Sequence, residues 1–213
     1  MKKYSVFSLI KNAFNGHKNW DIAWRDPEPK KEYDAVIIGG GGHGLATAYY
    51  LAKNYGIKNV AILEKGWIGG GNIGRNTTIL RSNYLHDANN LFYDHGMQMW
   101  KDLSQELNYN VMYSPRGILN LAHSDSQMNT YSRRGNSMRL NGIDASLIGR
   151  EEVKKMIPFA DFTENARFPI FGGLLQPIGG TARHDAVAWG YARAADDMGV
   201  DIIQHCEVNG FDI

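Results

Sequence analysis

The residues with the clearest chemical potential form a glycine-rich turn. Gly39, Gly41 and Gly44 occupy the three glycine places of a G-x-G-x-x-G pattern. Such a pattern provides a tight turn, a close backbone approach to a diphosphate, and close packing of a helix on a strand. A helix that begins here directs N–H groups and a partial positive charge toward the same place. The pattern predicts a binding site for the ADP part of a dinucleotide.

The segments around this turn have the order that such a site requires. Residues 34–38 (DAVII) predict a strand, and residues 45–53 predict a helix. Residues 59–63 predict a second apolar strand that stops at Glu64. A carboxylate at this position suits the hydroxyl pair of an adenosine ribose. NAD and FAD both present ADP, so this half-site leaves the choice between them open.

The segment after the acid favours FAD. Residues 65–84 (KGWIGGGNIGRNTTILRSNY) are glycine-rich and polar, and they run on without starting another strand–helix unit at once. A segment of this kind can lie beside an extended FAD and place backbone groups against the isoalloxazine ring. An ordinary glycine-rich surface loop is the alternative that spacing alone leaves open.

These residues resemble a known family. The run at 39–84, together with WRDPEPKKEYD at 24–34, SPRGILNLAH at 114–123 and RHDAVAWGYARAADDMGVDIIQHCEVNGF at 183–211, is similar to the beta subunits of heterotetrameric sarcosine oxidases. Those proteins belong to the glycine-oxidase and D-amino-acid-oxidase group of flavoproteins. The resemblance covers residues 24–213. It implies an α/β fold with a GR-type, Rossmann-like FAD-binding domain and an inserted mixed α+β substrate domain.

The resemblance also implies domain limits and cofactor contacts. The limits are an N-terminal extension over 1–29, FAD-binding domain over 30–100, part of the substrate domain over 101–174, and FAD-binding domain again over 175–213. The implied non-covalent contacts to FAD are Gly39, Gly41, Gly42, His43, Gly44, Glu64, Lys65, Asn72, Thr77, Ile79 and Val208. Family members are considerably longer, and this chain stops soon after an apolar strand, so we expect an N-terminal fragment.

A histidine near residue 184 gains a role only through the resemblance. The family motif K-H-D-H-V-A-W joins a histidine covalently to FMN, a second flavin, and this chain reads RHDAVAW at 183–189. Ala186 replaces the second histidine of the motif, so the resemblance leaves His184 to form the bond. From the residues alone, a histidine at a helix start is most often a capping or surface residue.

The implied reaction is the oxidative demethylation of sarcosine to glycine, with electrons passing through FMN to oxygen. Formaldehyde or methylene-tetrahydrofolate and hydrogen peroxide are the other products. Arg81, in TILRSNY, resembles an arginine that faces the substrate carboxylate in monomeric sarcosine oxidases, and a structural arginine is an equal alternative. The implied partners are alpha, gamma and delta subunits. Two other functions stay open: a dimethylglycine-type dehydrogenase of N-methyl amino acids, and a non-catalytic flavin-binding scaffold.

The rest of the chain must position these groups, and its patterns predict several elements. We expect strands at 118–122, 171–177, 200–203 and 206–208, helices at 126–140 and 147–157, a turn at 179–181, and a helix capped by Asp185 and closed by Gly199. The first residues predict a short docking helix or a loose tail. Residues 17–31 predict an extended arm that lies on another surface, which could belong to a partner.

Composition limits the remaining function classes. The 213 residues are 43% hydrophobic, and 23 basic against 22 acidic residues give a net charge of +1. This offers no broad basic field for nucleic acid or an anionic membrane. Cys206 is the only cysteine, and no apolar run is long enough to cross a membrane. We expect a cytoplasmic protein. The histidines show no metal-site spacing, so no metal is predicted.

Overall fold

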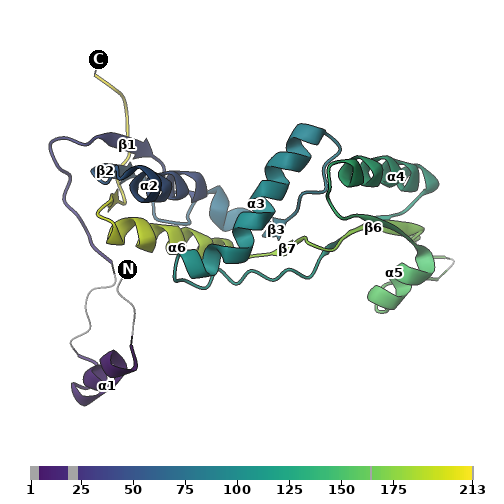
Figure 1. Ribbon diagram of the computed structural model, residues 1–213, viewed down its shortest axis with the longest axis horizontal. Helices are drawn as coiled ribbons and strands as arrows, with labels where there is room; N and C mark the ends of the chain where they lie inside the picture. Colours follow the sequence, from purple (N-terminus) through teal and green to yellow (C-terminus); the bar gives the residue numbers. More distant parts are fainter. Residues whose placement is uncertain (1–4, 19–23, 164, 213) are drawn as a thin grey trace. The chain divides into compact units, whose positions relative to one another are not determined.

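The computed structural model describes residues 5–18, 24–163 and 165–212 (Figure 1). Two units make up the chain. The first comprises Met1–Asn76, Gln105–Val111 and His184–Ile213, and the second comprises Thr77–Ser104 and Met112–Arg183. Each unit has its own sheets, helices and buried residues, and each is described by itself.

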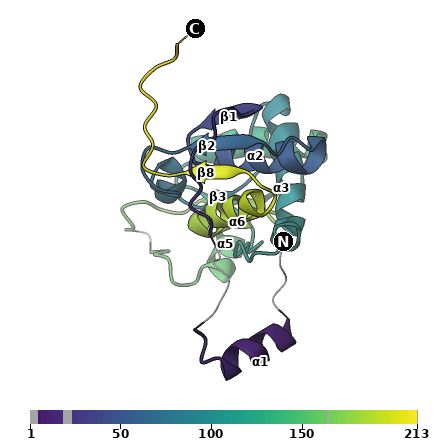
Figure 2. The same ribbon diagram turned by 90° about the vertical axis from the view of Figure 1, so that its left-hand side faces the viewer.

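A parallel sheet forms the centre of the first unit. Its strands are β1 (Ala35–Ile38), β2 (Val60–Leu63) and β8 (Asp201–Ile203), in the order β1-β2-β8 (Figure 2). Helix α2 (Gly42–Tyr55) connects β1 to β2, and α6 (His184–Asp197) leads into β8. This strand–turn–helix–strand order is the one predicted from residues 34–64. It confirms the nucleotide-binding type of architecture in this part of the chain.

Small side chains let α2 and α6 pack closely on each other. Ala48 in α2 and Ala188 and Ala192 in α6 are fully buried. Tyr49 and Tyr191 meet edge to face, with ring centroids 5.6 Å apart. The opposite face of β1 is different, because Val36 and Ile38 are about half exposed there. The sheet is therefore covered by helices on the α2 side, and β1 shows apolar side chains on its other side.

The second unit is built on antiparallel strands. Strands β4 (Ile118–Ala122), β6 (Gly172–Gln176) and β5 (Ser146–Gly149) form one sheet in the order β4-β6-β5. The short strands β3 (Ile79–Leu80) and β7 (Gly180–Thr181) form another. Helix α3 (Asp87–Glu106) begins in this unit, and α4 (Asp125–Leu140) and α5 (Arg150–Met156) belong to it. Met138, Ile143, Ala145 and Leu174 form a buried cluster in this unit.

Two predictions of secondary structure in this unit are wrong. The predicted helix at 147–157 begins only at Arg150, because Leu147 and Ile148 pair with β6 as part of β5. The predicted turn at 179–181 contains β7, since Gly180 and Thr181 pair with β3. In both places, pairing with a strand distant in the sequence overrides the local pattern. The strand at 118–122 and the helix over 126–140 are confirmed.

Two further expectations fail in the first unit. Asp185 lies inside the first turn of α6 and is not its N-cap. The strand expected at 206–208 is absent from the described residues, where only β8 (Asp201–Ile203) forms. The chain turns immediately after β8, because His205 has a positive φ of 54°. Gly199 ends the α6 region as expected, with a φ of +101°.

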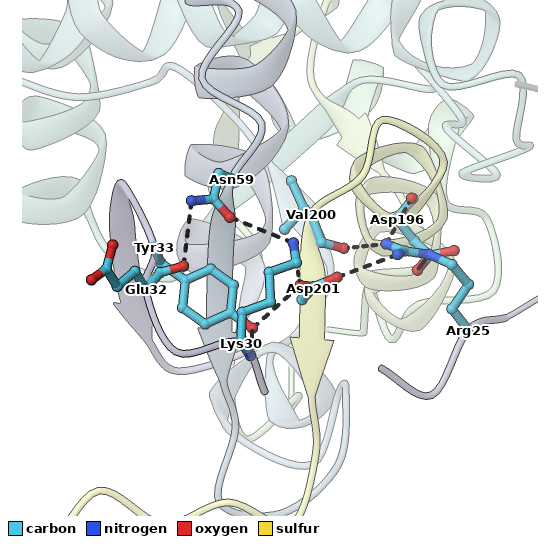
Figure 3. A network of polar contacts seen from close by, with 8 residues as sticks. All are labelled: Arg25, Lys30, Glu32, Tyr33, Asn59, Asp196, Val200 and Asp201. Carbon is cyan, nitrogen blue, oxygen red and sulfur yellow. Dashed lines mark hydrogen bonds and ion pairs between the residues drawn. The ribbon is translucent and has the colours of Figure 1, made fainter. Parts of the chain in front are cut away.

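The extended arm before β1 is held on its own unit. The Arg25 Nε atom lies 2.8 Å from Asp196 Oδ1, and its Nη2 atom donates to the Val200 carbonyl at 2.7 Å (Figure 3). The Lys30 Nζ atom lies 2.7 Å from Asp201 Oδ2 (Figure 3). Asp201 is only 2% exposed. The arm thus supplies the cations that compensate two largely buried carboxylates.

Replacing Arg25 with alanine should weaken the first unit. We expect the free energy of unfolding to fall by about 2 kcal/mol, because two carboxylates and two backbone carbonyls lose a charged donor while Lys30 remains. Urea unfolding followed by tryptophan fluorescence measures this change. The exposed Lys58→Ala variant serves as the control and should stay within about 0.5 kcal/mol of the parent protein.

The same variant has a defined pH dependence. Burial raises the pKa of Asp196, and the Arg25 guanidinium opposes this rise. Loss of Arg25 therefore costs most when the Asp196 carboxylate is ionised, and the cost should shrink as the pH falls and this carboxylate becomes protonated. A destabilisation that is equal at pH 7 and pH 4 would contradict the role assigned to this ion pair.

Candidate functional site

The glycine turn between β1 and α2 brings two backbone segments into close contact. Gly39 has a φ of +106°, which glycine adopts without strain, and its N–H donates to the Leu63 carbonyl at 2.8 Å. A Cβ atom on Gly44 would lie 2.0 Å from the Gly39 carbonyl oxygen. No side chain can occupy that space, so helix and strand can pack this closely only with glycine at position 44.

Gly41, in contrast, faces open space. It is the N-cap of α2, and no side chain caps the helix there. A Cβ atom at this position would meet no atom within 4 Å. The first N–H groups of a helix have no carbonyl partner within the helix, and together they favour a bound anion. The start of α2 at Gly41, called the cradle below, therefore has the free space and the N–H donors that a diphosphate requires.

Glu64 is fixed beside this turn by backbone donors. Its Oε2 atom accepts from Gly40 N at 2.7 Å and its Oε1 atom accepts from Gly66 N at 2.8 Å. A Cβ atom on Gly40 would lie 3.0 Å from the Glu64 Cβ atom, so the turn approaches the acid closely. Each carboxylate oxygen can accept a second hydrogen bond, which leaves capacity for a pair of hydroxyl groups.

The chain after β8 returns to the same acid. Cys206 N donates to the Glu64 carbonyl at 2.9 Å, and His205 N donates to the Gly66 carbonyl at 2.9 Å. Val208, an expected cofactor contact, follows two residues later and is partly buried. The structure thus brings the segment around Val208 near Glu64 although the two are far apart in the sequence.

The other expected contacts of the first unit lie around the same loop. His43 is exposed in the first turn of α2, and Lys65 is exposed beside Glu64. Asn72 begins a short 3-10 helix, η1 (Asn72–Arg75). A Cβ atom on Gly42 would lie 2.8 Å from the Ile73 Cδ1 atom. The loop after Glu64 therefore packs against the start of α2, where the turn is located.

His184 is the first residue of α6. Its Nδ1 atom is buried and has no hydrogen-bond partner among the residues that the structure describes. A buried ring nitrogen without a partner costs free energy, so such an atom needs an explanation beyond packing. This observation separates His184 from an ordinary capping or surface histidine.

Arg81 lies in the second unit, directly after β3, within a network of amide side chains. Its Nη1 atom donates to Asn83 Oδ1 at 2.7 Å, and Asn83 Nδ2 donates to Asn120 Oδ1 at 2.6 Å. The Arg81 guanidinium also lies over the Tyr84 ring, 5.0 Å from its centroid. Burial raises the pKa of Tyr84, and the nearby Arg81 charge partly opposes this effect. These contacts hold the guanidinium in one orientation.

Two buried polar residues next to Arg81 and on β6 were not among the predicted site residues. Gln176 Nε2 donates to Ser82 Oγ at 2.6 Å, and Gln176 Oε1 accepts from Ser82 N at 3.2 Å. Both residues are fully buried. A glutamine that ends the otherwise apolar GGLLQ strand was the available signal. Thr77 and Ile79, both expected cofactor contacts, are exposed and flank this same stretch.

The fold and the turn define the chain's first unit as a dinucleotide-binding α/β domain of the flavoprotein type. The profile of the family described as FAD dependent oxidoreductase (DAO) matches residues 34–213. The chain belongs to this family. FAD is therefore the dinucleotide, and the open cradle at Gly41 and the braced Glu64 fit its ADP part.

Several known proteins are similar over most of the chain. Sarcosine oxidase subunit beta from Rhizobium meliloti is 64% identical over 98% of this chain and 50% of its own length. The protein of the same name from Rhodobacter capsulatus is 54% identical over 99% of this chain and 50% of its own. Glycine oxidase from Bacillus subtilis is 28% identical over 84% of this chain and 47% of its own. The chain thus spans about half the length of these curated relatives.

A solved structure agrees with the fold. L-proline dehydrogenase from P. horikoshii superposes with a TM-score of 0.78 and 28% identity, over 87% of this chain and 47% of that protein. These findings confirm the resemblance and the fold class expected from the sequence. Among the described residues, no helix could cross a membrane and no cluster of three potential metal ligands occurs.

Two glycine variants distinguish the structural from the binding role of the turn. Gly44→Ala should lower the free energy of unfolding by about 3 kcal/mol, because its methyl group would meet the Gly39 carbonyl oxygen. Gly41→Ala should leave stability within about 0.5 kcal/mol, since its methyl group enters open space and its backbone is extended. The same methyl group should weaken FAD binding at least about tenfold.

Urea unfolding and titration of the apoprotein with FAD, followed by flavin fluorescence, measure the two effects. Gly96→Ala in α3 is a suitable comparison and should bind FAD as the parent protein does, because a Cβ atom there also meets no atom within 4 Å and the position lies in the second unit. If Gly41→Ala bound FAD as tightly as the parent protein, the diphosphate would not lie at this cradle.

Proposed function

We propose that this protein is the beta subunit of a heterotetrameric sarcosine oxidase and that it oxidises sarcosine to glycine. The identity of 64% and 54% to two proteins named sarcosine oxidase subunit beta, over nearly the whole chain, carries this proposal. Membership of the FAD dependent oxidoreductase family supplies the class of chemistry. Two alternative functions must be distinguished from this one by assay. They are a related dehydrogenase of dimethylglycine type and a non-catalytic flavin-binding scaffold.

The first unit would hold FAD through the residues already described. The N-terminus of α2 would bind the diphosphate, and Glu64 would bind the ribose hydroxyl groups. The backbone near Val208, together with His43, Lys65 and Asn72, would complete the contacts. Bound FAD would accept the two electrons and the hydrogen that leave the N-methyl carbon of the substrate. The chain's own contribution is to bind and orient the cofactor.

The second unit would supply the substrate anchor. The Arg81 guanidinium is planar and permanently charged, and it suits the carboxylate of an amino acid. Asn83 and the Tyr84 ring hold it in place, so little side-chain freedom would be lost on binding. Thr77 and Ile79, which precede Arg81 in the sequence and are exposed, would be further cofactor contacts.

A second flavin belongs to this proposal. The buried Nδ1 atom of His184 lacks a hydrogen-bond partner in the described part of the chain, which supports a special role for this ring. We assign it the covalent attachment of FMN, through which electrons would pass to oxygen. The alpha, gamma and delta subunits of a cytoplasmic heterotetramer would be the partners, and the names of the relatives as subunits support an assembly of this kind.

Arg81→Lys tests the substrate anchor. A lysine keeps the charge but cannot make bidentate hydrogen bonds to the substrate carboxylate. We therefore expect kcat/KM for sarcosine to fall by about tenfold to hundredfold while FAD content is unchanged. Oxygen uptake by the assembled enzyme measures the rate. Arg116→Lys, at an exposed position of the same unit, should behave as the parent protein. Equal rates for the two variants would show that Arg81 is a structural arginine.

His184→Ala tests the covalent flavin. The assembled parent enzyme should keep flavin fluorescence on this chain after denaturing electrophoresis, and the variant should lose it. His205→Ala is the matched control, because His205 is exposed in the first unit. Fluorescence that persists in His184→Ala would place the covalent bond elsewhere. Turnover with dye acceptors and none with oxygen would favour the dehydrogenase.

A further inference from the structure

The N-terminal helix α1 (Val6–Phe14) presents an apolar face that the residues described by the structure do not bury. Ser5 caps it by accepting from Ser8 N at 3.1 Å, and none of its nine residues is buried. Phe7 is 81% exposed and Phe14 is 88% exposed. The helical period places Val6, Phe7, Leu9, Ile10, Ala13 and Phe14 on one face. Ser8, Lys11 and Asn12 lie on the other.

A helix of this length has little stability of its own. Isolated helices shorter than about 12 residues are marginal in water, and most helical stability in proteins comes from packing of an apolar face. The sequence nevertheless supplies a cap, a helical period and large apolar side chains on one side. These features agree with each other only if the face of α1 is buried against another surface.

The arm that follows this helix in the sequence is anchored on the first unit. Trp24 meets Trp189 edge to face with ring centroids 5.3 Å apart, and Arg25 and Lys30 are ion-paired to buried carboxylates (Figure 3). The arm is therefore anchored from residue 24 onward, and the segment at 15–23 links it to α1.

The N-terminal segment that contains α1 lies outside the part of the chain that matches the oxidoreductase family. The family profile begins at residue 34, and glycine oxidase matches only 84% of the chain. Two of the three relatives named sarcosine oxidase subunit beta match 98% and 99% of it, so these two matches include most of the N-terminal segment, and the third matches 90%. The segment is shared with proteins that are named as parts of an assembly.

We propose that the apolar face of α1 docks into an apolar groove on a different subunit of the same oxidase. This inference rests on the proposed function, which makes the protein a beta subunit. Residues 1–18 contain Lys2, Lys3, Lys11 and Lys18 and no acidic residue. The groove should therefore be lined by aliphatic or aromatic side chains and bordered by carboxylates, which is the helix-in-groove mode of recognition.

A membrane surface fits α1 less well. Helices that lie in a membrane interface have a polar face rich in lysine and arginine. The polar face of α1 carries Lys11 and is otherwise neutral, with Ser8 and Asn12. Its two phenylalanines are large anchors of the kind that fill pockets at protein interfaces.

Two variants with equal added charge test the docking. Phe7→Asp/Phe14→Asp places carboxylates on the apolar face, and Ser8→Asp/Asn12→Asp places them on the polar face. The chain is co-expressed with the other subunits, and native mass spectrometry and sedimentation measure assembly. The apolar-face variant should associate at least about tenfold more weakly with the other subunits at unchanged FAD content. The polar-face variant should assemble as the parent protein does.

A photo-cross-linking residue at position 7 identifies the occupant. Cross-links to a subunit of different mass support the proposal. Cross-links between two copies of this chain overturn it. The proposal is also overturned if the apolar-face variant still assembles but no longer binds phosphatidylserine vesicles that the parent protein binds. Normal assembly of the apolar-face variant also overturns it. Because assembly is measured by mass, a parent complex that forms through α1 but does not oxidise sarcosine refutes the proposed function alone.

Discussion

The close approach between the Gly39 carbonyl and the start of α2 is the constraint on which the first unit depends. A Cβ atom at Gly44 would lie 2.0 Å from that oxygen, so only a bare backbone lets the helix begin so near the strand. This contact fixes where α2 begins, at Gly41, where no side chain caps the helix and a Cβ atom would meet no atom within 4 Å. It also places Gly40 N on the Glu64 carboxylate at 2.7 Å. One packing requirement thus fixes both the start of α2, where we propose that the diphosphate binds, and the position of the neighbouring acid.

The sequence was most informative where chemistry and local structure coincide. Gly39, Gly44 and Glu64 could be assigned from their spacing because the turn, the helix and the second strand are contiguous. It failed where a residue's partner is distant. Leu147 pairs with β6 and Gly180 pairs with β3, and local helix or turn signals do not contain those partners. The buried amide of Gln176 and its Ser82 partner are 94 residues apart, so no local pattern could join them.

The arm before β1 is held to α6 and β8 by ion pairs with two largely buried carboxylates. Asp201 is the first residue of β8 and is buried, and its carboxylate contacts Arg25, Lys30 and the Tyr33 hydroxyl. The arm was expected on another surface, and from Trp24 onward that surface is the chain's own first unit; Trp20 lies outside the described residues. The arm therefore stabilises the fold of the first unit, and α1 before it is the segment that we propose to bind a partner.

Hydrogen–deuterium exchange of the apoprotein, with and without added FAD, tests the central claim most directly. The claim is that the start of α2 and the Glu64 loop hold the ADP part of FAD. It predicts that FAD slows exchange in peptides that contain residues 39–44 and 64–66, while peptides of α4 in the second unit are unchanged. Tight FAD binding with no slowing at residues 39–44 would contradict the account.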